Sequence, residues 1–152
     1  MLIYLMRHGE AEQQGQSDQT RELTRKGVVD TRAVMEKLKL RSPQIERAMM
    51  SPFQRARQTI TSLRAVSPTL RYEVNQNLVP DASVYDLLDS FETANVMQLF
   101  LVSHNPLLSD LLSLMVDGTL ESNRQMGCSE IACVSMDIIA PGCGELLYTI
   151  TP

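Results

Sequence analysis

The chain has only two histidines, three cysteines and no tryptophan among its 152 residues. Cys128, Cys133 and Cys143 lie close together late in the sequence, far from His8 and His104. This spacing is unlike that of a zinc site, and an odd number of cysteines leaves at least one thiol unpaired. We therefore expect reduced, structural cysteines, and we expect no metal ion and no other cofactor.

A long hydrophobic run is also absent. The first apolar run ends at Arg7 after six residues, which is too short for a secretory signal or a membrane span. The net charge is −4, and binding to a phosphate backbone requires a basic face. The sequence thus predicts a cytoplasmic protein without a membrane or nucleic-acid partner. A few cations close together in an acidic protein favour the binding of a small anion, such as phosphate, or of one phosphoryl group.

No repeat, low-complexity tract or linker divides the chain. We therefore expect a single domain over residues 1–152, a length that is sufficient for one sizeable core. Once the core residues are assigned, no long apolar stripe remains for a partner subunit to cover. The sequence therefore favours a monomer.

Segments typical of strands and of helices alternate along the chain. Strands are predicted at 2–6, 45–50, 70–74, 96–102, 131–138 and 145–150. Helices are predicted after Thr24, after Ser51, and over 83–91 and 107–115, and a polar loop over 10–21. A turn at 141–144 joins the last two strands as an antiparallel pair. This order predicts an α/β fold, a three-layer sandwich whose mostly parallel central sheet is flanked by helices and has an antiparallel C-terminal edge.

Both histidines follow predicted strands of this sheet. His8 comes after Arg7 at the end of the first strand, and His104 comes after Ser103 at the end of the 96–102 strand. The carboxyl ends of parallel strands share one edge, so we expect the two rings to lie at the same edge of the sheet. Either histidine alone is compatible with a structural role, and the coincidence of the two favours a site.

A second arginine belongs to the start of the helix after Ser51. We predict Ser51 as the N-cap, Pro52 at the first helical position and Gln54 as the partner that completes a capping box. Arg55 then lies in the first turn, where free backbone N–H groups already favour an anion. A guanidinium there can bind two phosphoryl oxygens, although an exposed structural arginine is an equal alternative.

These motifs resemble those of the histidine phosphatase superfamily, which includes the cofactor-dependent phosphoglycerate mutases. The matching segments occur in the same order over about residues 1–138 and read RHGE at 7–10, LTRKG at 23–27, SPFQRARQT at 51–59 and VSH at 102–104. Within the superfamily, the short length and the details of these segments are most similar to the SixA-type phosphohistidine phosphatases. The resemblance implies a phosphoglycerate mutase-like fold and phosphatase activity.

The resemblance also implies a role for each matching residue. His8 would be the nucleophile that takes the phosphoryl group on a ring nitrogen. Arg7, Arg55 and His104 would complete the catalytic set by stabilising charge on the transferred group. The implied phosphate-binding residues are Arg7, Gly9, Arg21, Ser51, Arg55 and His104, of which Arg21 and Ser51 fit structural roles better. Thr24 and Gly27 are interpreted as helix-start residues.

The chain departs from the superfamily at the acid that usually follows the third strand and protonates an ester oxygen. Residues 75–81 read NQNLVPD and contain no glutamate; Asp81, Glu10 and Glu12 are the possible substitutes. Asp81 fits better as a cap or turn residue before the next helix. An alkoxide leaves poorly without a proton donor, whereas imidazole leaves phosphohistidine readily. The departure therefore favours cleavage of a P–N bond.

Only 48 residues lie between Arg55 and His104, which leaves little chain for a lid. An open site would admit phosphohistidine on another protein, and by family analogy this partner is a histidine-containing transfer domain of a phosphorelay. Two alternatives remain open: a small-molecule phosphomonoester phosphatase and a non-catalytic phosphate-binding module. A mutase is disfavoured because it must hold its phosphoenzyme in a closed site.

Overall fold

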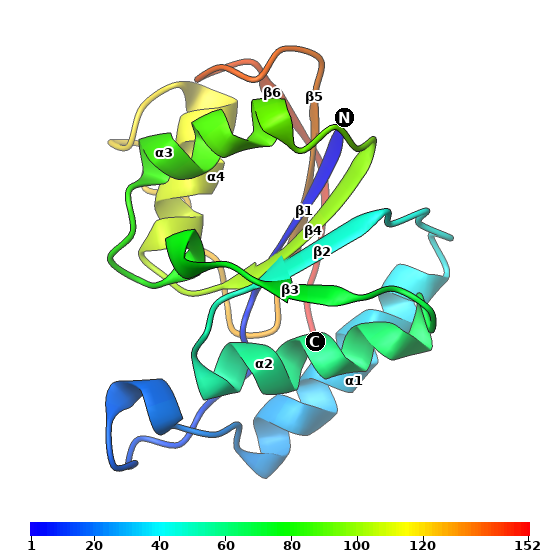
Figure 1. Cartoon of the computed structure of the whole chain (residues 1–152), viewed down its shortest axis with the longest axis vertical. Coiled ribbons are helices and arrows are strands. Elements are labelled where there is room, and N and C mark those ends of the chain that lie inside the picture. The colour runs from blue at the N-terminus through cyan, green and yellow to red at the C-terminus, as the bar shows by residue number, and fades with distance from the viewer.

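A six-stranded mixed sheet runs through the middle of the molecule, as the computed structural model of residues 1–152 shows (Figure 1). In sequence order, its strands are β1 (Leu2–Arg7), β2 (Arg47–Met50), β3 (Tyr72–Val74), β4 (Gln98–Ser103), β5 (Ile131–Met136) and β6 (Gly144–Ile150). The helices are α1 (Arg25–Lys39), α2 (Gln54–Thr61), α3 (Val84–Asp89) and α4 (Leu107–Asp117). Short 3-10 helices are η1 (Asp18–Thr20), η2 (Ser62–Ala65), η3 (Gln76–Leu78) and η4 (Ser90–Thr93).

The strand order β3-β2-β4-β1-β5-β6 combines a parallel part with an antiparallel edge. β3, β2, β4 and β1 run parallel to one another, whereas β5 is antiparallel to both β1 and β6. The α/β fold class predicted from the sequence is confirmed, including the antiparallel C-terminal pair.

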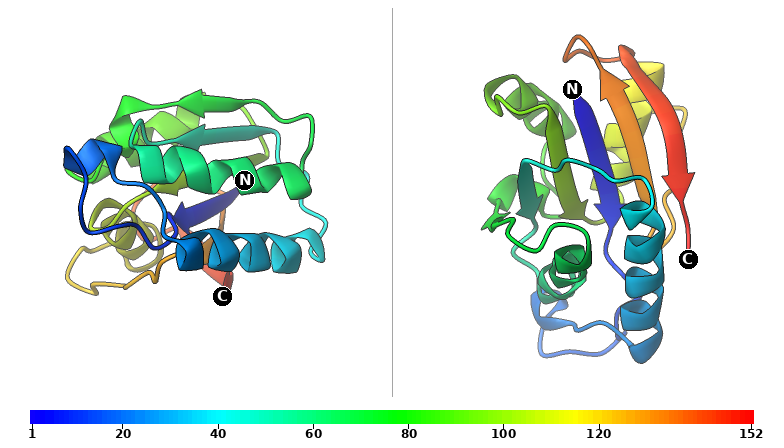
Figure 2. Two further views of the ribbon diagram at one scale, coloured as in Figure 1. Left: turned by 90° about the horizontal axis from the view of Figure 1, so that it is seen from below. Right: turned by 90° about the vertical axis from the view of Figure 1, so that its right-hand side faces the viewer.

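Side chains of β1 alternate between two hydrophobic cores, one on each face of the sheet. Ile3 and Leu5 belong to a cluster of 20 buried residues under α3 and α4. Tyr4 and Met6 belong to a cluster of 15 buried residues under α1 and α2. Figure 2 shows α1 and α4 on opposite sides of the sheet. Both faces of the central strands are thus covered, which explains why β1 and β4 are almost continuously apolar.

Some predicted elements differ from the observed ones. The predicted 83–91 helix is α3 followed by η4, because the Ser90 hydroxyl donates to the Leu87 carbonyl and competes with the helical backbone pattern. The strand predicted over 131–138 ends at Met136, and the 10–21 loop contains η1. All three cysteines are free, and none of the helices is both long and apolar enough to cross a membrane.

Candidate active site

The carboxyl ends of β1, β4 and β2 meet at one edge of the sheet. Arg7 pairs in register with Ser103, the last residue of β4. The next residues continue the ladder, because the His8 amide donates to the Ser103 carbonyl at 3.0 Å and the Ser51 amide donates to the Val102 carbonyl at 3.0 Å. These hydrogen bonds bring the residues after three strands to one place, as the topology argument predicts.

The His8 ring is held in one tautomer. Its Nδ1 lies 2.6 Å from the carbonyl oxygen of Gly9, and its Nε2 accepts a hydrogen bond of 3.1 Å from Nε of Arg55. A carbonyl can only accept and a guanidinium can only donate, so the proton lies on Nδ1 and the lone pair on Nε2. Burial lowers the pKa of His8 to about 4; the Gly9 hydrogen bond raises it, and the charges of nearby arginines lower it further. His8 is therefore neutral at pH 7.

His104 lies beside His8, with ring centroids 4.9 Å apart and planes inclined by 57°. Its Nε2 is 2.7 Å from the hydroxyl of Ser51, its ring packs against Phe53, and its Nδ1 is buried without a hydrogen-bond partner. Burial lowers the pKa of His104 to about 2, and the charges of His8 and Arg55 act in the same direction. Both imidazoles at this edge are thus neutral at pH 7.

Arg55 is buried, and both edges of its planar guanidinium are engaged. Its terminal edge is bound by Asp18 of η1: Nη1 donates to the Asp18 backbone carbonyl at 2.6 Å, and Nη2 donates to the Asp18 carboxylate at 3.0 Å. Its lateral edge presents Nε to His8. Figure 1 shows the blue η1 segment beside the start of α2, which carries Arg55. Asp18 therefore holds the guanidinium with Nε directed at the His8 lone pair.

Arg21 connects to the same network from the outside. Its Nη1 donates to the Asp18 carboxylate at 2.8 Å and its Nε donates to the Glu12 carbonyl at 2.6 Å. Burial acts to raise the pKa of Asp18, but the hydrogen bonds from Arg21 and Arg55 lower it below its usual value. Asp18 is therefore a carboxylate at pH 7 and has no proton to donate.

Asp18 is the site residue that the sequence reasoning missed. It lies in a loop without hydrophobic periodicity, so no pattern indicates that it folds back onto α2. Its only local signal is its spacing three residues before Arg21. That spacing is consistent with an ion pair and does not point to Arg55.

Arg7 and Gly9 are fixed by contacts of different kinds. Arg7 donates from Nη1 to the Met126 carbonyl at 2.7 Å, and its Nε is buried without a partner. A Cβ on Gly9 would lie 2.7 Å from the Thr31 hydroxyl of α1, so glycine is required for the approach of that helix. The Gly9 amide donates to the Thr59 hydroxyl at 3.0 Å.

The predicted capping box at the start of α2 is wrong. Phe53 is the N-cap and the helix begins at Gln54. The Ser51 hydroxyl is 3.4 Å from the Phe53 amide and is directed to His104, because that buried ring needs a hydrogen-bond partner. Arg55 still lies in the first turn.

The predicted N-cap of α1 is confirmed, since the Thr24 hydroxyl accepts from the Gly27 amide at 2.9 Å.

The three carboxyl groups considered from the sequence have other surroundings. The Glu10 side chain accepts from the Thr24 hydroxyl at 2.9 Å, at the start of α1. Asp81 and Glu12 are exposed, and neither side chain makes a hydrogen bond. No three His, Cys, Asp or Glu side chains gather where they could hold a metal ion. Asp18 is thus the carboxyl group that hydrogen-bonds the site arginines.

Comparison with known proteins gives a consistent result. The model of the histidine phosphatase superfamily (branch 1) matches residues 3–79. The phosphohistidine phosphatase SixA of Escherichia coli is 31% identical, in an alignment that covers 100% of this chain and 94% of that protein. A structure of the protein histidine phosphatase SixA complexed with tungstate has a TM-score of 0.86 at 30% identity and covers 100% of this chain and 97% of its own. A structure from Agrobacterium tumefaciens, with a TM-score of 0.85 and 20% identity, covers 99% and 97% and shows the shared fold.

Proposed function

This chain belongs to the histidine phosphatase superfamily, and from that premise we propose that it hydrolyses phosphohistidine on a protein through a phosphorylated His8 intermediate. The choice of substrate rests on the protonation state of Asp18. This carboxyl group is bonded to Arg55 and Arg21, which keep it ionised, so it cannot protonate a leaving alkoxide. Imidazole needs much less assistance, because the nitrogen that leaves is itself basic.

The first step is attack by Nε2 of His8 on phosphorus. The bond between phosphorus and Nε2 forms as the P–N bond of the substrate breaks, and the departing imidazole takes a proton from solvent. In the second step, water attacks the phosphorus on His8 and the new P–N bond breaks; the water oxygen leaves in the phosphate, its proton passes to solvent, and Nε2 regains its lone pair. The neutral ring and the proton fixed on Nδ1 support this role, because they leave Nε2 free to react.

The groups around His8 would bind the phosphoryl oxygens. Once Nε2 bonds to phosphorus, the Nε–H of Arg55 is free to donate to a phosphoryl oxygen. The buried Nε of Arg7 supplies a second donor. If the Ser51 hydroxyl donates to Nε2 of His104, the neutral ring carries its proton on Nδ1, and this becomes a third donor. Loss of one such donor is expected to cost about 3–4 kcal/mol of transition-state stabilisation, by analogy with an oxyanion hole.

The proposed partner rests on the short chain between Arg55 and His104, which leaves little room for a lid, and on the relatives. SixA is a phosphohistidine phosphatase and aligns with the whole of this chain. We therefore propose a phosphohistidine-bearing protein as substrate, with a histidine-containing transfer domain of a phosphorelay as the family analogy, and a cytoplasmic, monomeric, single-domain enzyme over residues 1–152.

The test compares kcat/KM on a phosphohistidine protein with kcat/KM on a panel of sugar phosphates, nucleotides and other phosphoesters. We expect preference for phosphohistidine; a hundredfold or greater preference for an ester would overturn the proposal. Brief exposure to labelled substrate should leave an acid-labile, alkali-stable phosphoryl label that His8→Ala abolishes. If His8→Ala retains normal turnover and His104→Ala does not, the two rings have the opposite roles.

A further inference from the structure

Positive charge is concentrated in the part of the chain that forms α1 and α2. The first 64 residues contain 12 of the 14 lysines and arginines but only 7 of the 18 acidic residues. The chain is therefore basic over 1–64 and acidic over 65–152, although its overall charge is −4. The acidic part includes α3 and α4, which lie on the opposite side of the sheet (Figure 2).

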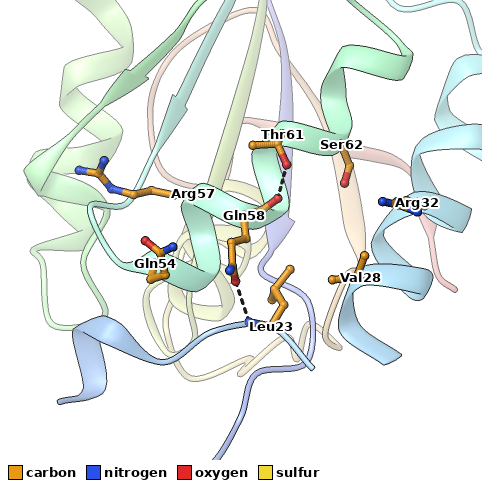
Figure 3. Close-up of a pocket in the computed structure, with 8 residues that line it drawn as sticks. All are labelled: Leu23, Val28, Arg32, Gln54, Arg57, Gln58, Thr61 and Ser62. Carbon is orange, nitrogen blue, oxygen red and sulfur yellow. Dashed lines mark hydrogen bonds between the residues drawn. The ribbon is translucent and has the colours of Figure 1, made fainter. Parts of the chain in front are cut away.

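A groove lies between α1 and α2 on the basic side (Figure 3). One cavity of about 380 Å³ is lined by Leu23, Val28, Arg32, Gln54, Arg57, Gln58, Thr61 and Ser62. A second cavity of about 290 Å³ shares Arg32, Thr61 and Ser62 with it and extends to Met35, Glu36 and Ala65. The two cavities share three lining residues and are therefore adjacent; together they are called here the α1–α2 groove.

One end of the α1–α2 groove lies at the first turn of α2. Gln54, which lines it, directly precedes Arg55 in α2. Gln58 accepts from the Leu23 amide at 2.7 Å, as Figure 3 shows, and thereby fixes the segment that follows Arg21 against α2. A molecule that occupies this end of the groove would contact the first turn of α2, the turn that carries Arg55.

The cations of the groove have no acidic partner. Arg32 and Arg57 are exposed and form no salt bridge; Arg57 donates only to the Pro52 carbonyl. No carboxylate lines the first cavity. In Figure 3 Arg32 stands on α1 and Arg57 on α2, and the Arg57 side chain extends from α2 away from α1. Both guanidiniums are free to bind carboxylates that a partner provides.

We propose that the α1–α2 groove binds an acidic segment of the protein that carries phosphohistidine, through Arg32 and Arg57. The inference rests on the proposed function. His8 is only 9% exposed, and a histidine side chain is short, so the surface of the carrier around its phosphohistidine must lie against the rim of the site. The basic helix pair that forms the groove favours an acidic carrier, and the acidic side of the sheet repels it.

The experiment uses three substrates: free phosphohistidine, a peptide with phosphohistidine flanked by glutamates, and a peptide of equal length with glutamines in their place. The groove variant is Arg32→Glu with Arg57→Glu. The matched control is Lys39→Glu with Arg71→Glu, two exposed cations that line neither cavity of the groove. Two exposed ion pairs are expected to change kcat/KM about fivefold to tenfold.

We expect the wild-type enzyme and the control variant to prefer the glutamate peptide by about that factor. The groove variant should lose the preference and keep its kcat/KM on free phosphohistidine, and added salt should reduce the wild-type preference. Equal rates on both peptides in the wild-type enzyme would overturn the docking proposal, as would an equal loss on all three substrates in the groove variant. Wild-type self-association that the groove variant abolishes would also overturn it, since the occupant would be a second copy. Failure of the proposed function is recognised separately, by the absence of turnover on all three substrates in the wild-type enzyme.

Discussion

Replacement of Asp18 by alanine tests whether the site depends on a residue outside the recognised motifs. The Asp18 carboxylate accepts from Nη2 of Arg55 at 3.0 Å and from Nη1 of Arg21 at 2.8 Å. The variant removes both contacts and leaves the bond from Arg55 to the backbone carbonyl of residue 18. The guanidinium then loses one of the two acceptors that fix its terminal edge, and its Nε is aimed less accurately at His8.

The size of the effect follows from the exposure of the carboxylate. A hydrogen bond to a charged group contributes about 1.5–3 kcal/mol when shielded from solvent. The Asp18 side chain is 54% exposed, so about 1 kcal/mol is the appropriate value. We expect kcat/KM on phosphohistidine to fall about fivefold, mainly through kcat, because the contact of Arg55 strengthens in the transition state. Asp18→Asn, which retains one oxygen acceptor, should fall less.

The assay is steady-state hydrolysis of phosphohistidine together with competitive inhibition by tungstate. The matched control is Asp117→Ala, which removes a carboxylate bonded to Arg124 at 2.6 and 2.9 Å in another part of the chain and should leave both measurements unchanged. If Asp18 only competed with anions for Arg55, Asp18→Ala would have the opposite effect. Turnover would then be faster and tungstate would inhibit more tightly than in the wild-type enzyme. That result would refute the positioning role.

Four further outcomes are expected. The acid limb of kcat/KM should have its midpoint near pH 4, because His8 stays neutral down to its lowered pKa; a midpoint near 6.5 would contradict the burial argument. In urea titrations, the free energy of unfolding should fall as pH decreases from about 6.5 to 4, by about 1.4 kcal/mol per pH unit for each of His8 and His104, since the unfolded histidines take up protons that the folded ones do not; a flat profile would contradict this. Gly27→Ala should lower the thermal midpoint although alanine favours helix, because a Cβ there would lie 2.1 Å from the Glu10 carbonyl; a raised midpoint would exclude this close contact. Activity should persist in EDTA, and loss that a divalent ion restores would contradict the metal-free proposal.

The convergence of His8, Arg55 and His104 could be predicted from the sequence for a physical reason. Each follows an apolar run short enough to be a buried strand, and parallel strands with helical connections bring their carboxyl ends to one edge. The fold class followed from the same alternation of elements. What local patterns predict, therefore, is the position of the backbone at the sheet edge.

The contacts that orient these side chains could not be predicted in this way. Asp18 reaches Arg55 from a loop, and the Met126 carbonyl reaches Arg7 across 119 positions of sequence. The capping pattern at Ser51 failed because a buried imidazole, which no local signal indicates, competes for its hydroxyl. Long-range polar contacts depend on the completed fold, since each is selected by the need to satisfy a buried group.

Burial and the charge balance of the site together keep its histidines neutral, and the same charge balance explains its ionised carboxylate. Arg7, Arg21 and Arg55 bring three positive charges to the rim, and Asp18 offsets one of them. A phosphoryl group carries about −1.5 to −2 at neutral pH, so its arrival nearly cancels the remaining charge. A protonated His8 would add a positive charge to the empty rim and remove the lone pair that reacts. Asp18 thus limits the repulsion among the arginines in the free enzyme. It does so without protonation of either imidazole, because its carboxylate is already hydrogen-bonded to two guanidiniums.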